Sequence, residues 1–162
     1  MKQSKRTIKK RRRKGKTDYK ARINLLKSSL PRVVIRKTNR YILVQYVESD
    51  EAADKVISSA SSRELFKYGW EKEKSGSLKS IPACYLTGML MGKKIKGKEV
   101  ILDIGLARDT KKGRIYAVLK GLVDSGVKIK CGKKEEPGEK RLKGEHLKNK
   151  IDFEKIKEKI LK

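Results

Sequence analysis

The stretch PRVVIRKTNRYILVQYV, residues 31–47, decides the fold because it predicts a β-hairpin. Its two apolar runs are rich in β-branched and aromatic residues, which are enriched in strands. Between them, the tip at residues 36–40 carries three cations and no acid. A turn needs no such charge. We therefore expect the two strands to hold the tip as a rigid projection that faces an anion outside the protein.

The segments beyond the hairpin complete a mixed α/β pattern. KVISSASS is a weaker third strand, which extends the hairpin into an antiparallel meander over residues 32–61. Pro82 then opens a helical pattern, and EVILDIG at residues 99–105 is a continuous apolar run, typical of a strand covered on both faces. IYAVLKGLVDSG predicts a second helix that ends at Gly126. We therefore expect an α/β domain with a mixed sheet, in which the meander is followed by helix, strand and helix.

Charge and composition divide the chain into three expected regions. Residues 1–30 form a basic N-terminal arm with a short helix capped by Thr17 or Asp18, and residues 31–129 form the α/β domain. Residues 130–162 form a charged C-terminal tail with a short helix in IDFEKIKEKIL. Residues 1–16 have only Met1 and Ile8 as apolar side chains, so we expect them to be disordered in the free protein.

Positive charge is the strongest signal for function. The 162 residues include 45 Lys and Arg against 19 Asp and Glu, a net charge of +26. The first 30 residues hold 13 basic and 1 acidic side chains. Such a chain favours polyanions, which in a cell are nucleic acids and acidic membrane surfaces. No apolar run approaches the roughly 20 residues of a membrane span, so we expect a cytoplasmic protein that binds nucleic acid and no membrane.

Three basic segments and one aromatic pair are the candidate nucleic-acid contacts. The cations of the arm have no acid near them, and the loop after EVILDIG places cations before a helix N-terminus, which favours phosphate. Tyr68 and Trp70 stack on unpaired bases or pack in the core, and the sequence leaves both readings open. The basic candidates are Lys9, Lys10, Arg11, Arg12, Arg13, Lys14 and Lys16 in the arm, Arg36, Lys37, Asn39 and Arg40 in the hairpin, and Arg108, Lys111, Lys112 and Arg114 in the loop.

Catalytic and metal chemistry has weak support. Asp103, in the apolar strand, is a candidate for a metal-dependent nuclease together with Asp109 or Asp124, but nothing in their spacing brings the three together. His146 is the only histidine, and Cys84 and Cys131 lie 47 residues apart without a CxxC pair. These residues form no triad and no zinc ligand set. We expect no cofactor, no metal and no small-molecule substrate.

Several segments together resemble a known family. GKTDYKARINLLKS, PRVVIRKTNRYILVQYV, SSRELFKYGW, SLKSIPACYLTGMLMGKK, ILDIGLARDTKKGRIYAVLKGLVDSG and RLKGEHL occur in this order over residues 11–147. They resemble the archaeal and eukaryotic branch of the 5S-rRNA-binding large-subunit ribosomal proteins, number eighteen in bacterial order. The insertion-like EKEKSGS after Trp70 departs from the family pattern, and the short tail suggests an archaeal version.

The resemblance implies a structural ribosomal protein without catalytic activity. Its expected partners are 5S rRNA, the 23S-type rRNA of the large subunit and neighbouring ribosomal proteins, and its expected place is the central protuberance of the cytoplasmic ribosome. By the same resemblance, Thr17, Asp18, Tyr19 and Arg22 join the RNA contacts of the arm, beside the hairpin and the loop. A metal-dependent nuclease, or a basic protein that compacts nucleic acid non-specifically, is the alternative.

Overall fold

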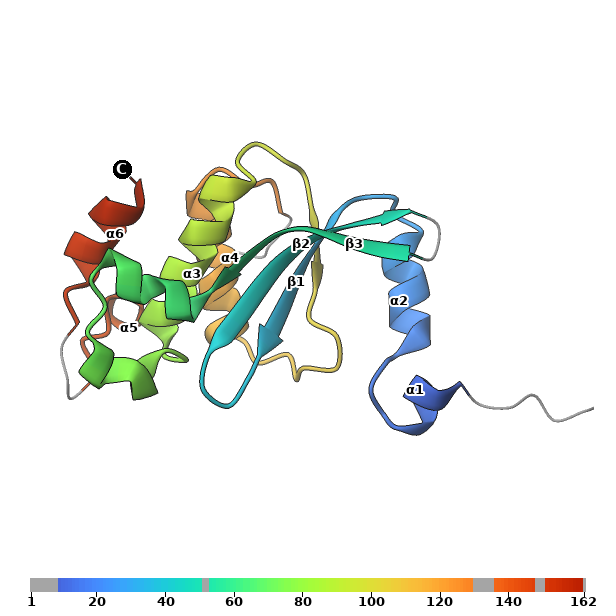
Figure 1. Ribbon diagram of the computed structural model, residues 1–162, viewed down its shortest axis with the longest axis horizontal. Helices are drawn as coiled ribbons and strands as arrows, with labels where there is room; N and C mark the ends of the chain where they lie inside the picture. Colours follow the sequence, from blue (N-terminus) through green and yellow to red (C-terminus); the bar gives the residue numbers. More distant parts are fainter. Residues whose placement is uncertain (1–8, 51–52, 130–135, 148–150, 162) are drawn as a thin grey trace, which may run out of the picture.

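A four-stranded mixed sheet lies at the centre of the computed structural model, which describes residues 9–50, 53–129, 136–147 and 151–161. The strands lie in the order β3-β2-β1-β4 (Figure 1). β1 and β2 are antiparallel, as are β2 and β3, whereas β1 and β4 are parallel. The strands are β1 (Arg32–Lys37), β2 (Ile42–Asp50), β3 (Ala53–Ser61) and β4 (Ile101–Asp103). The expected mixed α/β fold with an initial meander is confirmed.

The predicted hairpin forms, and its register places apolar residues of the two strands opposite one another. Val33 pairs with Tyr46 and Ile35 with Val44, and all four side chains are at most 2% exposed. Successive residues of a strand point to opposite faces, so these residues share the face that builds the core. Thr38 closes the tip, because its hydroxyl donates to the carbonyl oxygen of Tyr41 over 2.7 Å. The tip is therefore held by both the strands and the turn.

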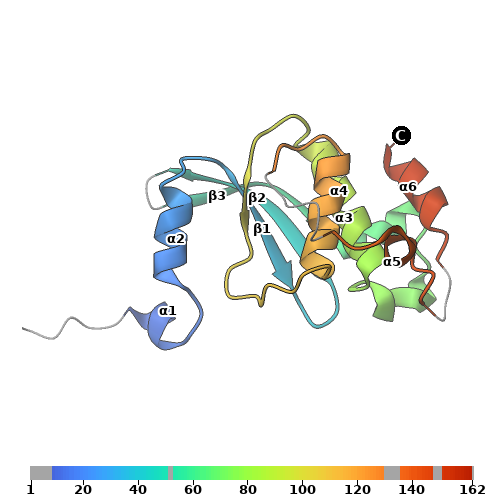
Figure 2. The same cartoon turned by 180° about the vertical axis from the view of Figure 1, so that it is seen from behind.

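Two helices, α3 (Ile81–Lys94) and α4 (Arg114–Asp124), pack closely against one another beside the sheet (Figures 1 and 2). Ser80 caps α3, with Pro82 in its first turn, and Gly126 follows α4 with a left-handed φ of 89°. A Cβ atom built on Gly88 of α3 would collide with the carbonyl oxygen of Val118 in α4. Glycine at this point lets the two backbones touch.

The strand predicted from EVILDIG is shorter and lies elsewhere than expected. Only Ile101–Asp103 form β4, and this strand lies at the edge of the sheet beside β1. Ile101 and Leu102 are partly exposed, so the run is not covered on both faces. The apolar run reflects two separate roles, because Val100, which is 4% exposed, packs in the core before the strand begins.

Two 3₁₀ segments connect β3 to α3: η1 (Ser62–Tyr68) and η2 (Lys72–Ser77). A capping box between Ser61 and Glu64 starts η1, and Gly69 ends it with a φ of 101°, a conformation that favours glycine. Gly69 therefore marks the end of η1, and residues 75–77 belong to η2.

The N-terminal arm lies at one end of the molecule, away from the core (Figures 1 and 2). It contains α1 (Lys10–Arg13) and α2 (Tyr19–Leu26), and neither has a buried residue. Of the two predicted caps, Thr17 and Asp18, Asp18 caps α2, since its Oδ1 accepts from the backbone amides of Lys20 and Ala21. The expectation of disorder is wrong for residues 10–13, which form one helical turn, and for residues 1–8 it lies outside the described residues.

Two C-terminal helices, α5 (Glu139–Lys143) and α6 (Phe153–Leu161), lie at the opposite end and pack on α3 (Figure 1). Phe153, Ile156 and Ile160 of α6 are each at most 7% exposed. Lys93 of α3 adds a hydrogen bond to this packing, because its ammonium donates to the carbonyl oxygen of Ile160 over 3.0 Å. The predicted tail helix is confirmed, and its apolar stripe packs within the chain.

Candidate nucleic-acid interface

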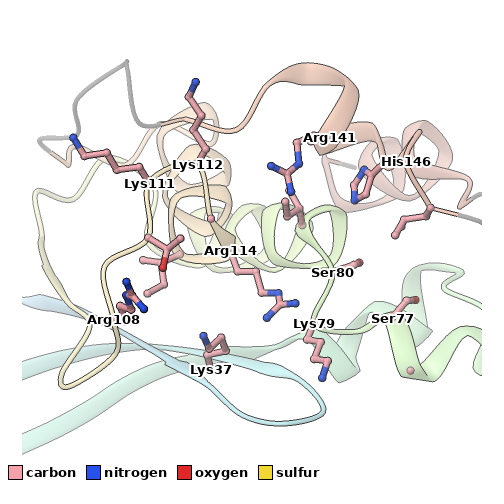
Figure 3. Close-up of a pocket in the computed structure, with 16 residues that line it drawn as sticks. Lys37, Ser77, Lys79, Ser80, Arg108, Lys111, Lys112, Arg114, Arg141 and His146 are labelled. Carbon is pink, nitrogen blue, oxygen red and sulfur yellow. The ribbon is translucent and has the colours of Figure 1, made fainter.

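A basic groove of about 610 Å³ lies between the N-terminal ends of α3 and α4 (Figure 3). Its walls come from the hairpin, the segment before α3, the loop before α4 and the C-terminal segment. Figure 3 shows Arg114 pointing into the space between Lys37 and Lys79. Among the described residues, no carboxylate lines the groove. Its cations are Lys37, Lys79, Arg108, Lys111, Lys112, Arg114 and Arg141, with His146 beside them.

The loop at residues 108–113 gives this groove its charge. Lys112 adopts a left-handed φ of 56°, which non-glycine residues rarely do, and Gly113 follows as the N-cap of α4. A Cβ atom on Gly113 would come within 2.6 Å of the carbonyl oxygen of Thr110. No side chain caps α4, so the free amides of its first turn add to the positive potential of the cations.

A second groove, of about 860 Å³, separates the arm from β1 and β4. One wall consists of arm residues, including Arg11, Lys16, Thr17, Asp18 and Arg22. The other wall includes Arg36 and Lys37 at the end of β1. Lys37 lines both grooves. The structure thus connects the arm and the loop before α4, two candidates that the sequence treated separately, through one lysine of the hairpin.

A chain of ion pairs joins the arm to the sheet. The carboxylate of Asp54 in β3 accepts from Arg22 of α2 over 2.8 Å and from Arg32 of β1 over 2.6 Å. Arg32 also donates to Asp103 over 3.0 Å, and Arg36 to the same carboxylate over 3.3 Å. Charges of opposite sign therefore alternate through five side chains, from the arm to the hairpin.

The ion pairs of this chain change the pKa of Asp54. Partial burial raises the pKa of its carboxyl, but hydrogen bonds from Ser49, Arg22 and Arg32 outweigh burial and hold the pKa below its usual range. Asp54 is therefore ionised at neutral pH, and it attaches an arm that has no buried side chain.

Arg36 corrects the description of the hairpin tip. The sequence indicated three cations without a compensating acid, but Arg36 is paired with Asp103, and its Nη1 donates to the carbonyl oxygen of Asp103 over 3.2 Å. Its side chain is 43% exposed and keeps one face toward solvent. Lys37, Asn39 and Arg40 are exposed. Among the described residues, the cations of the tip without an ion pair are therefore Lys37 and Arg40.

Trp70 is not available for base stacking. It is 3% exposed, belongs to the core and donates from Nε1 to the carbonyl oxygen of Lys74 over 3.3 Å. Of the two readings that the sequence left open, core packing applies to Trp70. Tyr68 is partly exposed and only packs against the core, so it retains an accessible surface.

The remaining arm candidates lie in solvent. Lys9, Lys10, Arg11, Arg12, Arg13, Lys14 and Lys16 are exposed. Two local contacts order this segment: Arg11 donates from Nε to Thr17 over 2.9 Å, and the ammonium of Lys9 lies 4.7 Å from the centre of the Tyr19 ring. These contacts place Tyr19 within the arm and shape its surface without burying it.

The residues proposed for nuclease chemistry have other roles. Asp103 is 7% exposed and accepts from two arginines and from the Gly105 amide, whereas Asp124 accepts from Tyr85 over 2.8 Å and pairs with Lys120. Among the described residues, no three His, Cys, Asp or Glu side chains lie together as metal ligands. Burial raises the pKa of the Cys84 thiol to about 12, and Cys131 lies outside the described residues.

Lys79, Arg141 and His146 were missed as groove residues. Lys79 and Arg141 lie 62 residues apart in the sequence, and both stand in segments of mixed charge that read as solvated surface. His146 was considered only for catalysis. The charge signal that marks the arm is absent around them, so no local pattern could find them.

Within the described chain, no helix has the length and apolarity needed to cross a membrane.

Comparison with known proteins decides the family. A family model described as ribosomal large subunit proteins 60S L5 and 50S L18 matches residues 3–99 and 92–131. The chain belongs to this family. A Korarchaeum cryptofilum L18-type protein, named large ribosomal subunit protein uL18, is 49% identical over 140 residues, which cover 85% of this chain and 70% of that protein. The proteins of the same name from Methanoregula boonei and Methanococcoides burtonii are 48% and 42% identical, over 85% and 93% of this chain and 78% and 91% of theirs.

Membership of the L5/L18 family confirms several expectations from the sequence. The chain is a large-subunit ribosomal protein, its relatives are archaeal, and it acts in the cytoplasmic ribosome with ribosomal RNA and ribosomal proteins as partners. The names of these relatives are those of ribosomal proteins and not of enzymes. An L18-type protein has a structural role, which agrees with the ion-paired state of Asp103 and Asp124.

Proposed function

We propose that this L18-type protein binds 5S rRNA and anchors it to the large-subunit rRNA in the central protuberance. The observation that carries the proposal is a pair of grooves that share Lys37, one bordered by the arm and the other, as far as the chain is described, by seven cations and no carboxylate. A surface of this kind releases counterions from RNA phosphates on binding. The proposed contacts are the arm, residues 36–40 of the hairpin and residues 108–114 of the loop.

Two grooves on either side of Lys37 suit a folded RNA better than a straight duplex. Shape-selective binders of RNA contact phosphates and sugars on several surfaces of a folded molecule. Arg11 and Lys16 in the arm groove and Arg114 in the basic groove offer such contacts on two sides of Lys37. The protein would thereby distinguish 5S rRNA from an RNA with equal charge but another fold.

The direct test compares affinities at near-physiological salt. The dissociation constant for 5S rRNA should be at least roughly tenfold lower than that for transfer RNA or a random duplex of equal length, and with about 6–10 phosphate contacts it should rise about a thousandfold between 50 and 200 mM salt. Equal affinity for the three RNAs would refute the proposal and favour non-specific compaction.

The anchoring function needs a second measurement. Large subunits reconstituted without this protein should lose 5S rRNA during sedimentation, and adding the protein back should restore it. If 5S rRNA stays bound in subunits that lack the protein, the anchoring part of the proposal is wrong, even where the isolated protein binds 5S rRNA.

A further inference from the structure

Two cations that no sequence pattern marked form one wall of the basic groove. Lys79 lies directly before α3, and Arg141 lies in α5 of the C-terminal segment. Both line the groove with Arg108 and Arg114, which belong to the loop and α4 (Figure 3). Figure 3 shows Arg141 on the far side of the groove from Lys37 and Arg108. The groove therefore has cations on both sides.

The wall is held in place by packing. Leu142, next to Arg141, is 8% exposed, and Gly144 ends α5 with a left-handed φ of 81°. A Cβ atom on Gly144 would come within 2.9 Å of Pro82 in the first turn of α3, so α5 sits directly against that helix. Ser80, next to Lys79, caps α3 through the amide of Ala83. Both cations thus project from backbone of fixed position.

Lys79 and Arg141 form no ion pair with an acid in the described part of the chain. Among the described residues, no ion pair joins Lys79 or Arg141 to a carboxylate, although several other lysines and arginines are paired. Glu139 and Glu145 lie nearby in the sequence without lining the groove. Unpaired cations that converge from separate elements repel one another, and an anion between them removes that cost.

The lining indicates which part of an RNA fits. It contains cations, the hydroxyl groups of Ser77, Ser80 and Thr110, aliphatic side chains and the imidazole of His146, but among the described residues no Phe, Tyr or Trp. Sequence-tolerant binding of bases uses aromatic stacking platforms, whereas lysine, arginine and hydroxyl groups bind phosphates and sugars. The groove is therefore suited to the backbone of an RNA strand and not to its bases.

We propose that Lys79 and Arg141 bind backbone phosphates of an RNA strand that lies in the basic groove, opposite Lys37 and Arg108. The C-terminal segment thereby becomes part of the RNA interface. The strand continues past Lys37 toward the arm groove, since Lys37 lines both. This inference rests on the proposed function, and it adds a second wall that holds the backbone independently of base sequence.

An acidic peptide of a neighbouring protein is a less suitable occupant. Lys37 lines both this groove and the arm groove, so an anion that contacts both needs regularly spaced charge past the hairpin. An RNA strand carries one negative charge at every nucleotide and meets this requirement. A peptide would also leave the arm groove without a partner.

The test uses two double variants of the full chain that remove the same charge. Lys79→Gln with Arg141→Gln removes the second wall. Lys72→Gln with Lys140→Gln is the matched control, because Lys72 lies in η2, Lys140 in α5, both are exposed, and neither lines the groove. Dissociation constants for 5S rRNA are measured for each protein at several salt concentrations, with hydroxyl-radical footprints of the RNA backbone.

The groove variant should bind 5S rRNA roughly tenfold more weakly than the control at physiological salt, and the slope of log K against log salt should be smaller by about 1.4–1.8, the loss expected for two phosphate contacts. One continuous stretch of backbone should lose protection. If the wild-type protein prefers 5S rRNA but both variants bind it equally well, the proposed phosphate contacts of Lys79 and Arg141 are refuted and the proposed function stands. If the wild-type protein shows no preference for 5S rRNA, the proposed function is refuted, and this inference with it. Unchanged 5S rRNA binding, with lost capture of an acidic ribosomal protein, would also overturn the inference.

Discussion

Arg32 and Asp103 form a buried ion pair between β1 and β4, with Nη1 of Arg32 3.0 Å from Oδ2 of Asp103. Arg32 is 1% exposed, and its second terminal nitrogen contacts Ser49 and Asp54. A single guanidinium thus joins the edge strand β4 to the far end of β2 and β3. Because β4 leads directly into the loop that carries Arg108 to Arg114, this pair also fixes where the loop begins.

Replacing Arg32 should destabilise the free protein strongly. Arg32→Ala leaves Asp103 with fewer partners in a buried position, and breaking a buried pair typically costs about 3–5 kcal/mol of unfolding free energy. Urea denaturation of the protein without RNA measures this. Arg40→Ala, at an exposed position of the hairpin tip, should change the unfolding free energy by less than about 0.5 kcal/mol. Equal effects of the two substitutions would contradict the role of the pair.

Asp54 should make stability depend on acid pH. Because its folded pKa lies below the unfolded value of about 3.9, the carboxylate contributes stability above that pH, and the contribution is lost as the pH falls through the folded pKa. Asp54→Asn should therefore lower Tm at pH 6, and the difference from wild type should shrink below about pH 4. Asp109→Asn, at an exposed loop position, should leave Tm nearly unchanged at pH 6. A constant difference for Asp54→Asn over this range would refute the assignment.

Trp70 offers a direct check of the core assignment, because it is the only tryptophan. Its fluorescence should be poorly quenched by iodide and should change little when RNA binds, since the ring is 3% exposed. Trp70→Phe should keep the affinity for 5S rRNA within about twofold, whereas loss of a stacked base would weaken binding by roughly fivefold or more. Strong quenching by RNA would show that the ring stacks after all.

The arm should contribute to RNA binding and little to folding. Residues 1–16 carry ten lysines and arginines, and α1 has no buried residue. Deleting residues 1–16 should change Tm by less than about 3 °C in the absence of RNA, which corresponds to about 1 kcal/mol for a domain of this size. The affinity for 5S rRNA should fall at least roughly tenfold at physiological salt. An arm with the same residues in scrambled order should restore most of it, and a collapse of Tm on deletion would contradict the prediction.

The sequence predicted those features that depend on local periodicity and capping. The hairpin, the capped helix after Asp18, the helix after Pro82 and the stripe of Phe153, Ile156 and Ile160 all follow from patterns within about ten residues. The position of β4 at the sheet edge does not, because an apolar run has the same appearance whether it is covered by helices or by loops.

The sequence predicted which segments of the candidate site are basic, but not which of their cations pair with an acid. The acid that compensates Arg36 is Asp103, 67 residues away, and no local pattern connects a hairpin to a carboxylate at that distance. Lys79 and Arg141 escaped for the same reason, since only the fold brings them to one groove. Trp70 was ambiguous because an aromatic side chain serves core packing and base stacking equally well.

The direct contact of the α3 and α4 backbones at Gly88, and again at Gly121, has a consequence for how the surface tolerates sequence change. The distance between these helices is set by main-chain atoms, so exchanging one apolar side chain for another elsewhere in the core leaves the spacing of their N-terminal ends unaltered. Substitutions between apolar residues elsewhere in the core therefore do not change the width of the groove at these N-terminal ends. The groove that contacts the nucleic acid therefore keeps its width when a core side chain away from Gly88 and Gly121 is exchanged for another of similar size.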